Sequence, residues 1–458
     1  MLFNYSCWLL ILNIQRIKRM AYTSKTLWLL ITIAFSLSCK NEKEHITTTD
    51  LCFINLAKGI KEPVENLLLS DLATDIEIIP LETSNNSIFN YENIKNIIST
   101  EHSLLIGTGN RILHFDRQGK YIGDIGNFGE GPQDFYYTRG LGYNEITQEV
   151  YVPSNFGTTN ELKIYHLKDG RFLGKIKIAP NGISLIANKN NGEAKEYCFI
   201  DGMHFVRRKL PLPNPEEEPW QIMIKNIKNE IVSYIYDPVT LKNIEQVTKM
   251  SGSDIIKAGT FWGSDTPILN RYNGNRSILF EGNDTVYHIA SDGTLCMRFL
   301  MNSRNKLSDK EIHQLNKAPQ YFNQGLIVKD FLETNHYIYL VVENEEYSYL
   351  LQFDKVSGDT RSLRKKGRLE HSNLMDIHYR IATSPKFIND LCGGPSFYPT
   401  FHNDYEWIDF YTPDEIISSI ESVKQQKVLY NNKKEQLLQL IETVNSYDNP
   451  IVFILKLK

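Results

Sequence analysis

The feature that most constrains the fold of this chain is one kind of hairpin that recurs along it. Each copy has an apolar strand, a polar turn and a second strand, with a glycine in four of the turns and a proline in the fifth. The copies recur at intervals of roughly 50 to 65 residues, as expected for the four-stranded blades of a β-propeller. A single blade cannot bury both of its faces, so blades stack around an axis. The five segments are Ile112–Ile125, Leu162–Ile176, Ile231–Ile244, Asp284–Phe299 and Tyr349–Leu363.

Short strands are also expected before and within the first hairpin. Their spacing of about ten residues and their content of Ile, Leu and Phe are typical of all-β domains. They are Asp75–Leu81, Asn93–Ser99, Ser103–Thr108 and Arg111–Asp116. A sixth blade is expected from about Pro385 to Tyr411. We therefore predict an all-β fold, a six-bladed β-propeller over residues 66–458.

The pattern changes from strand to helix near the C-terminus. Thr412 suits the N-cap of a helix and Pro413 suits its first turn. We predict a helical insertion over residues 412–446, followed by a closing strand over residues 450–458. This strand is expected to pair beside Asp75–Leu81, which would remove an open sheet edge.

Residues 1–39 have the character of a targeting segment and are kept out of the fold. They hold two apolar runs, and each is shorter than a membrane-crossing helix requires. If Met20 rather than Met1 is the start, the segment still has a basic region, an apolar region and small residues before a cysteine. Residues 40–65 have the character of a polar tether.

The run FSLSC, Phe35–Cys39, resembles the lipobox of bacterial lipoproteins, whose cysteine becomes the lipidated first residue of the mature chain. Leu37 lies one position closer to the cysteine than is usual. The resemblance implies lipidation at Cys39 and an exported chain, anchored to the membrane in the cell envelope. Both faces of the outer membrane, periplasmic and external, stay open. An ordinary signal peptide and an uncleaved anchor are the alternatives.

A glycine-rich run lies between the first two hairpins, at Ile125–Phe135. Gly126 and Gly131 have the spacing of a phosphate-binding P-loop, but Pro132 stands where that loop needs a lysine. The residues that follow do not form an amphipathic helix, which argues against a dinucleotide loop too. We predict a turn that links the outer strand of one blade to the inner strand of the next.

This run resembles the blade junction of NHL-type propellers. Together with Asp75–Thr83, Gly393–Phe401 and the C-terminal strand, it resembles a family of six-bladed β-propeller lipoproteins of Gram-negative envelopes. The resemblance spans about residues 60–458 and implies a fold and a cell location, not a reaction. The irregular stretch Asn181–Glu230 departs from it and leaves the strand order of the third blade open.

Charge and motifs exclude several classes of function. The formal net charge is −4 and the pI is about 6.3, which gives no indication of a nucleic-acid partner. His402, Asp404 and Asp409 lie close together, but polar residues at alternate strand positions commonly face solvent, so no metal site is predicted. Neither an HExxH metal motif nor a GxSxG nucleophile motif occurs, and no cofactor or catalytic residue is predicted.

Tyr136, Tyr137 and Arg139 follow the glycine run and are the tentative ligand-facing residues, because aromatic rings with an arginine suit a sugar or a carboxylate. Packing between blades is their alternative role. The leading prediction is a binding or interaction module for a glycan, a peptide or an envelope protein partner. The alternative is a lyase or hydrolase acting on a glycan or peptide in the axial channel. A third option is a structural subunit that docks through residues 412–446.

Overall fold

The computed structural model describes residues 52–61, 63–135, 140–156, 159–177, 194–200, 202–208, 220, 222–236, 268–280, 285–302, 326–367 and 384–458. These residues belong to the unit Leu51–Lys458. The predicted targeting segment 1–39, with Cys39, lies outside the described residues.

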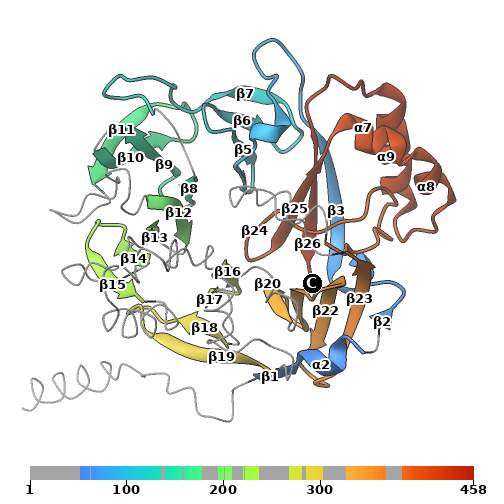
Figure 1. Cartoon of the computed structure of the whole chain (residues 1–458). Coiled ribbons are helices and arrows are strands. Elements are labelled where there is room, and N and C mark those ends of the chain that lie inside the picture. The colour runs from blue at the N-terminus through green and yellow to red at the C-terminus, as the bar shows by residue number, and fades with distance from the viewer. Residues whose placement is uncertain are drawn as a thin grey trace, which may run out of the picture. The chain divides into compact units, whose positions relative to one another are not determined.

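Six sheets arranged around a common axis form the fold, which confirms the six-bladed propeller (Figure 1). In blades one to five the four blade strands lie side by side in chain order, beginning with the innermost strand. Blade one has β4 (Asn96–Ser99), β5 (Ser103–Gly107), β6 (Ile112–Asp116) and β7 (Tyr121–Asp124). Blade two has β8 (Gly142–Asn144), β9 (Glu149–Phe156), β10 (Thr159–His166) and β11 (Phe172–Lys177). Blade three has β12 (Ala194–Ile200), β13 (Met203–Arg208), β14 (Ile222–Asn226) and β15 (Ile231–Ile235), so its strand order is regular.

The second half of the ring follows the same plan until its last blade. Blade four has β16 (Ile268–Tyr272), β17 (Asn275–Leu279), β18 (Thr285–Ile289) and β19 (Leu295–Asn302). Blade five has β20 (Ile327–Glu333), β21 (Tyr337–Glu343), β22 (Tyr347–Asp354) and β23 (Thr360–Lys366). Blade six has β24 (Phe401–His402), β25 (Glu406–Tyr411) and β26 (Ile451–Leu457), and its outer strand is β3 (Ala73–Pro80) from the other end of the chain.

Blade six closes the ring as the sequence predicted. β26 pairs antiparallel with β3, with Phe453 opposite Ile78. Buried apolar residues form six clusters in the described part of the chain, and each cluster joins two neighbouring blades. Burial between blades therefore stabilises the ring as a whole, since no blade has a separate core.

The recurrent hairpins are the third and fourth strands of their blades, and their turns share one backbone feature. In blades one to five the turn holds a residue with positive φ, a conformation that glycine adopts freely and asparagine tolerates better than most residues. These residues are Gly119, Gly170, Asn229, Gly293 and Gly358. β15, the first part of the hairpin predicted for Ile231–Ile244, pairs back onto β14 across Asn229. Residues 237–244 lie outside the described residues.

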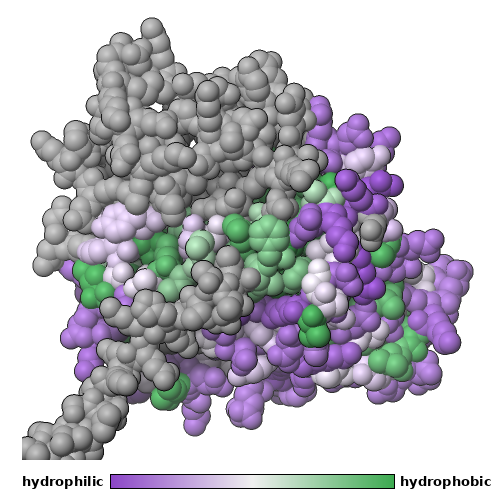
Figure 2. All heavy atoms as spheres, turned by 90° about the horizontal axis from the view of Figure 1, so that it is seen from below, coloured by the Kyte–Doolittle hydropathy of each residue, from purple (hydrophilic) through white to green (hydrophobic). Residues whose placement is uncertain are grey.

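A short N-terminal segment runs along the outer edges of blades four and five. β1 (Cys52–Asn55) pairs parallel with β19, α2 (Leu56–Gly59) follows, and β2 (Pro63–Val64) pairs parallel with β23. The sequence assigned these residues to the polar tether, but here they are folded onto the body. β1 and β19 lie at the bottom of Figure 1, so they face the viewer in Figure 2, where a band of hydrophobic residues crosses the middle of the face.

The helical insertion between β25 and β26 is confirmed, and it consists of three helices. They are α7 (Pro413–Ser418), α8 (Ile420–Gln425) and α9 (Asn431–Thr443). Thr412 and Glu415 form a capping box at the start of α7, with Pro413 in the first turn. Leu437 and Ile441 of α9 are buried in the cluster that joins blades five and six. Two single-turn helices, η1 (Leu69–Asp71) and η2 (Tyr91–Asn93), flank β3.

Candidate functional site

A cleft lies between the segment that leads into blade six and the helical insertion. Its volume is about 430 Å³, within the ≈300–1,000 Å³ typical of ligand pockets. One wall comes from residues 388–396 and the other from α8 with the residue after it. Apart from one isoleucine and one glycine, all lining residues carry neutral hydrogen-bonding side chains. They are Ile388, Asn389, Gly394, Ser396, Ser422, Gln425 and Gln426.

Among the lining residues, Asn389 has a side-chain donor without a hydrogen-bond partner in the described part of the chain. Its Oδ1 accepts from the backbone N–H of Cys392 at 3.2 Å and from the Cys392 thiol at 3.5 Å. These bonds fix the orientation of the carboxamide, so Nδ2 is the free end. Nδ2 is buried and has no hydrogen-bond partner among the described residues. A buried donor without a partner costs roughly 1–3 kcal/mol, so an acceptor brought into the cleft would relieve that penalty.

The turn that follows Asn389 holds this amide in place. The Asn389 carbonyl accepts from the Gly393 N–H at 3.0 Å and from Gln426 Nε2 at 3.1 Å. Gly394 has a φ of 112°, which side chains rarely allow. A Cβ at Gly394 would lie 2.9 Å from Leu437 Cδ2 and 3.8 Å from Asn389 Nδ2. The glycine thus permits close packing of α9 and keeps space open beside the amide.

Hydrogen bonds from β25 support the wall that contains Ser396. The Tyr411 hydroxyl donates to the Ser396 carbonyl at 3.0 Å. Thr400 Oγ1 donates to Asp409 Oδ1 at 2.7 Å. Burial raises the pKa of Asp409 to about 6 because an ionised carboxylate is poorly solvated there.

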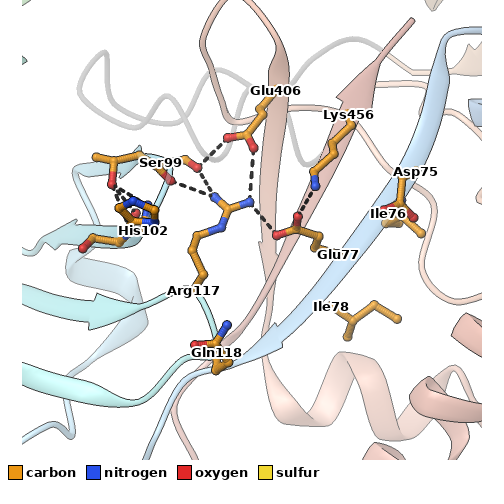
Figure 3. Close-up of polar contacts among 12 residues, drawn as sticks. Asp75, Ile76, Glu77, Ile78, Ser99, His102, Arg117, Gln118, Glu406 and Lys456 are labelled. Atoms are coloured by element: carbon orange, nitrogen blue, oxygen red, sulfur yellow. Dashed lines mark hydrogen bonds and ion pairs between the residues drawn. The ribbon is translucent and has the colours of Figure 1, made fainter. Parts of the chain in front are cut away.

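A cluster of charged side chains lies at the seam between blades one and six (Figure 3). Arg117, in the β6–β7 turn, contacts Glu77 of β3 at 2.5 Å and Glu406 of β25 at 3.1 Å, and it also bonds Ser99 Oγ. Lys456 of β26 contacts Glu77 at 2.6 Å. Every charge in the cluster has an opposite partner, as expected of a contact that joins elements rather than one that awaits a ligand.

One serine–histidine pair occurs inside blade one. His114 Nε2 lies 2.8 Å from Ser103 Oγ, and both residues are buried on neighbouring strands. Burial lowers the pKa of His114, so the imidazole is neutral near pH 7. Because the pair is enclosed in the sheet, it is a cross-strand contact and presents no nucleophile to a ligand.

The sequence grouped His402, Asp404 and Asp409, and the structure separates them into two environments. Asp404 pairs with Arg271 of β16 at 2.8 Å, and His402 is near enough for their charges to affect its pKa, which burial lowers to about 4. Asp409 instead accepts a hydrogen bond from Thr400 Oγ1 at 2.7 Å. No group of three or more potential metal ligands occurs in the described part of the chain.

The predicted ligand-facing residues, Tyr136, Tyr137 and Arg139, lie outside the described residues. The glycine run before them links β7 to β8, as predicted. Gly131 N–H donates to Asp134 Oδ2 at 3.1 Å, and a Cβ at Gly129 or Gly131 would lie 2.6 Å from that oxygen. The loop therefore closes around its own carboxylate, which occupies the space that a bound phosphate would need.

Sequence reasoning missed the cleft, because its two walls are brought together only when the insertion packs on blade six. One local signal existed. The adjacent glycines Gly393 and Gly394 both adopt positive φ, and a glycine pair is a cue for close backbone approach.

Comparison with known proteins gives a family and a fold. The sequence model of a family described as "Domain of unknown function (DUF4934)" matches residues 51–456. No curated protein matches the chain. None of the helices in the described ranges has the length and apolar character needed to cross a membrane.

Two solved structures are similar. One is a candidate exported protein from Bacteroides fragilis, with 13% identity and a TM-score of 0.55, covering 89% of this chain and 99% of its own. The other is a member of the DUF4221 family from Bacteroides vulgatus, with 12% identity and a TM-score of 0.40, covering 65% of this chain and 87% of its own. At such identities the likeness shows the fold alone, and the NHL-like and lipoprotein resemblances stay predictions.

Proposed function

This chain belongs to the family described as "Domain of unknown function (DUF4934)", and we propose that it is an envelope lipoprotein whose propeller binds an extended peptide segment of a partner protein in the cleft. The lipoprotein part rests on the lipobox-like Cys39. A Cys39→Ala variant should leave the membrane fraction for the soluble fraction; retention in the membrane would contradict the anchor.

The spare donor of Asn389 carries the binding proposal. Its Nδ2 is buried beside the cleft without a partner, and the best relief is an acceptor on a ligand. The remaining polar lining consists of two glutamines and two serines. These groups are neutral hydrogen-bonding groups and favour binding over the acid–base chemistry of a lyase or hydrolase.

The chemistry of the lining favours a peptide over a glycan. Asn389 offers its spare Nδ2 donor, and Gln425 carries both a donor and an acceptor, which is the hydrogen-bonding pattern of a peptide group. The lining residues include no aromatic ring to stack on a sugar and no charge to pair with an ionised side chain. An extended segment of uncharged residues is therefore the best match.

The experiment measures binding of a panel of uncharged peptides to the protein by calorimetry. Asn389→Asp keeps an oxygen for the Cys392 N–H and replaces the spare donor with an acceptor. We expect it to weaken peptide binding tenfold or more, roughly the effect of one lost hydrogen bond with an unpaired partner. Ser422→Ala, a second lining change, should weaken binding to a smaller extent.

Lys424→Ala is the matched control, since Lys424 lies on α8 but its exposed side chain pairs with Glu421 and does not line the cleft. It should bind the panel as the natural chain does. Peptide binding that is unaffected by Asn389→Asp would contradict the proposal. Binding of neutral oligosaccharides with the same dependence on Asn389 would replace the peptide with a glycan.

The lyase or hydrolase acting in the axial channel stays the alternative prediction. No observation on the described residues favours it over binding.

A further inference from the structure

β1 extends blade four farther outward than the blade beside it. It adds a fifth strand to the outer edge of blade four, whereas blade three ends at its fourth strand, β15, in the described part of the chain. Phe53 of β1 lies opposite Leu300 of β19, and Met297 of β19 lies opposite Tyr287 of β18. Leu300 lies opposite Thr285, two residues before Tyr287. Phe53, Met297 and Leu300 therefore share one face of blade four.

We call Phe53, Met297 and Leu300 the rim stripe. The stripe lies on the face turned toward blade three, because Tyr287 packs against the apolar cluster that joins blades three and four. The other face of β1 is covered, since Ile54 is buried in the cluster that joins blades four and five. Because blade three does not extend as far as β1, the rim stripe stays open to solvent: Phe53 is 52% and Met297 is 53% exposed.

The rim stripe has the properties of a contact surface. A band of hydrophobic residues crosses the face of the molecule on which β1 and β19 are turned toward the viewer (Figure 2). Neighbouring exposed apolar residues mark sites of contact with a protein or a membrane. On an edge strand such residues also promote aggregation unless they are covered.

The position of Cys39 in the sequence favours a membrane as the cover. Only residues 40–51 separate Cys39 from Cys52, the first residue of β1. Residues 40–51 can span at most about 40 Å even when fully extended. A lipid on Cys39 would therefore hold the outer edge of blade four within that distance of the bilayer. The outer edge of blade one, β7, lies on the opposite side of the ring (Figure 1).

We propose that the rim stripe rests on the lipid surface, so that the propeller meets the membrane with the outer edge of blade four. This inference rests on the lipid anchor of the proposed function. The apolar side chains of the stripe enter the boundary between headgroups and acyl chains, about 5–10 Å deep, as the apolar face of an interfacial helix does. The contact adds to the anchor and determines which side of the propeller faces the membrane.

The test places a tryptophan in the rim stripe of the full chain. Phe53→Trp and Met297→Trp are each reconstituted into vesicles of phosphatidylethanolamine and phosphatidylglycerol, with and without bromine on the acyl chains near the headgroups. The emission of the natural chain, which holds five tryptophans, is subtracted. We expect the bromine to remove about half of the added emission in both variants, because a ring at the proposed depth lies within its reach.

Ile122→Trp is the matched control, because Ile122 lies on β7 and is also 52% exposed. Bromine should leave its added emission unchanged. Melting curves check that each variant is folded, and the two rim positions serve as alternatives if one variant does not fold. An equal loss of emission in Ile122→Trp would overturn the proposal. Unchanged emission in both rim variants would also overturn it and would leave the stripe for a protein partner.

Fractionation of the natural chain and of Cys39→Ala tests the anchor separately. If the natural chain stays in the membrane fraction and neither rim variant loses emission, the anchor stands and the rim contact fails. If the natural chain is found in the soluble fraction, the anchor fails and the rim contact fails with it.

Discussion

Two polar regions meet blade six, and they differ in whether every polar group has a partner. At the seam with blade one, Arg117, Glu77, Glu406 and Lys456 pair with one another. In the cleft under the insertion, Asn389 keeps a buried donor that no described residue satisfies. The contrast separates two uses of polarity in one blade. Paired charges join the chain's two ends, and the spare amide is the group that we propose meets a ligand.

The prediction with the largest expected effect disrupts the seam between blades one and six. Gly119 lies in the same turn as Arg117, with a φ of 84°, and a Cβ there would lie 2.1 Å from the Pro80 carbonyl oxygen of β3. Because that oxygen belongs to the backbone, β3 must move. We expect Gly119→Ala to lower the free energy of unfolding by about 4 kcal/mol, the sum of backbone strain and overpacking, as measured by urea denaturation.

Gly358→Ala is the matched control for that change. Gly358 occupies the corresponding turn of blade five with a φ of 73°, and no atom lies within 4 Å of an added Cβ. Gly358→Ala should lower the free energy of unfolding only by the cost of the left-handed backbone conformation, about 1–2 kcal/mol. Equal losses in the two variants would show that the contact with Pro80 contributes nothing at the seam.

The next effect removes the charge at the centre of the seam. Arg117→Met leaves Glu406 without its cation, while Glu77 keeps Lys456. Because the cluster is mostly buried, we expect a loss of about 3 kcal/mol in unfolding free energy. Arg171→Met, at an exposed pair with Asp169, should change stability by less than about 0.5 kcal/mol. If Arg117→Met lowered the unfolding free energy as little as Arg171→Met, apolar burial alone would stabilise the seam.

The prediction with the smallest expected effect concerns the protonation of Asp409 in β25. The folded state holds a proton on Asp409 up to about pH 6, whereas the unfolded chain releases it near pH 4. Stability contributed by this group is therefore present below pH 4 and is lost as the pH rises to about 6. Asp409→Asn should raise the free energy of unfolding by about 1–2 kcal/mol at pH 7.5 and leave it unchanged at pH 4. Thermal melting across that range measures the difference. A loss at both pH values would show that the amide does not fit the contact with Thr400.

The sequence predicted the ring well because the ring depends on local signals. A glycine turn between two apolar strands needs no distant partner, so four third-and-fourth-strand hairpins were identified with their turns. In blade three the corresponding turn is at Asn229, which takes the positive φ. The sequence prediction placed this turn later, because a Pro-containing stretch was the stronger turn signal. The pairing of the C-terminal strand with Asp75–Leu81 was also predicted, since both ends were apolar strands in need of a neighbour.

The cleft and the seam were not predictable in the same way. The two walls of the cleft come from segments tens of positions apart, with Gln426 bonded to Asn389. The seam joins Arg117 to Glu406, which is 289 positions away, and no spacing rule connects such positions. β1 and β2 were missed because they are strands of four and two residues that follow the polar residues of the predicted tether. The expected ligand-facing residues were chosen for their chemistry near a glycine run, whereas the cleft is lined by side chains with no distinctive motif.

The pairing of β3 with β26 has a consequence for the order in which the molecule can be made. A ribosome produces Ile78 hundreds of residues before Phe453, its partner across the sheet. β1 and β2 are likewise synthesised long before β19 and β23, the strands with which they pair. The earliest strands of the body to be synthesised are thus among the last to find their places. Until the chain is finished, an apolar strand without its neighbour is exposed to the cell's chaperones and proteases.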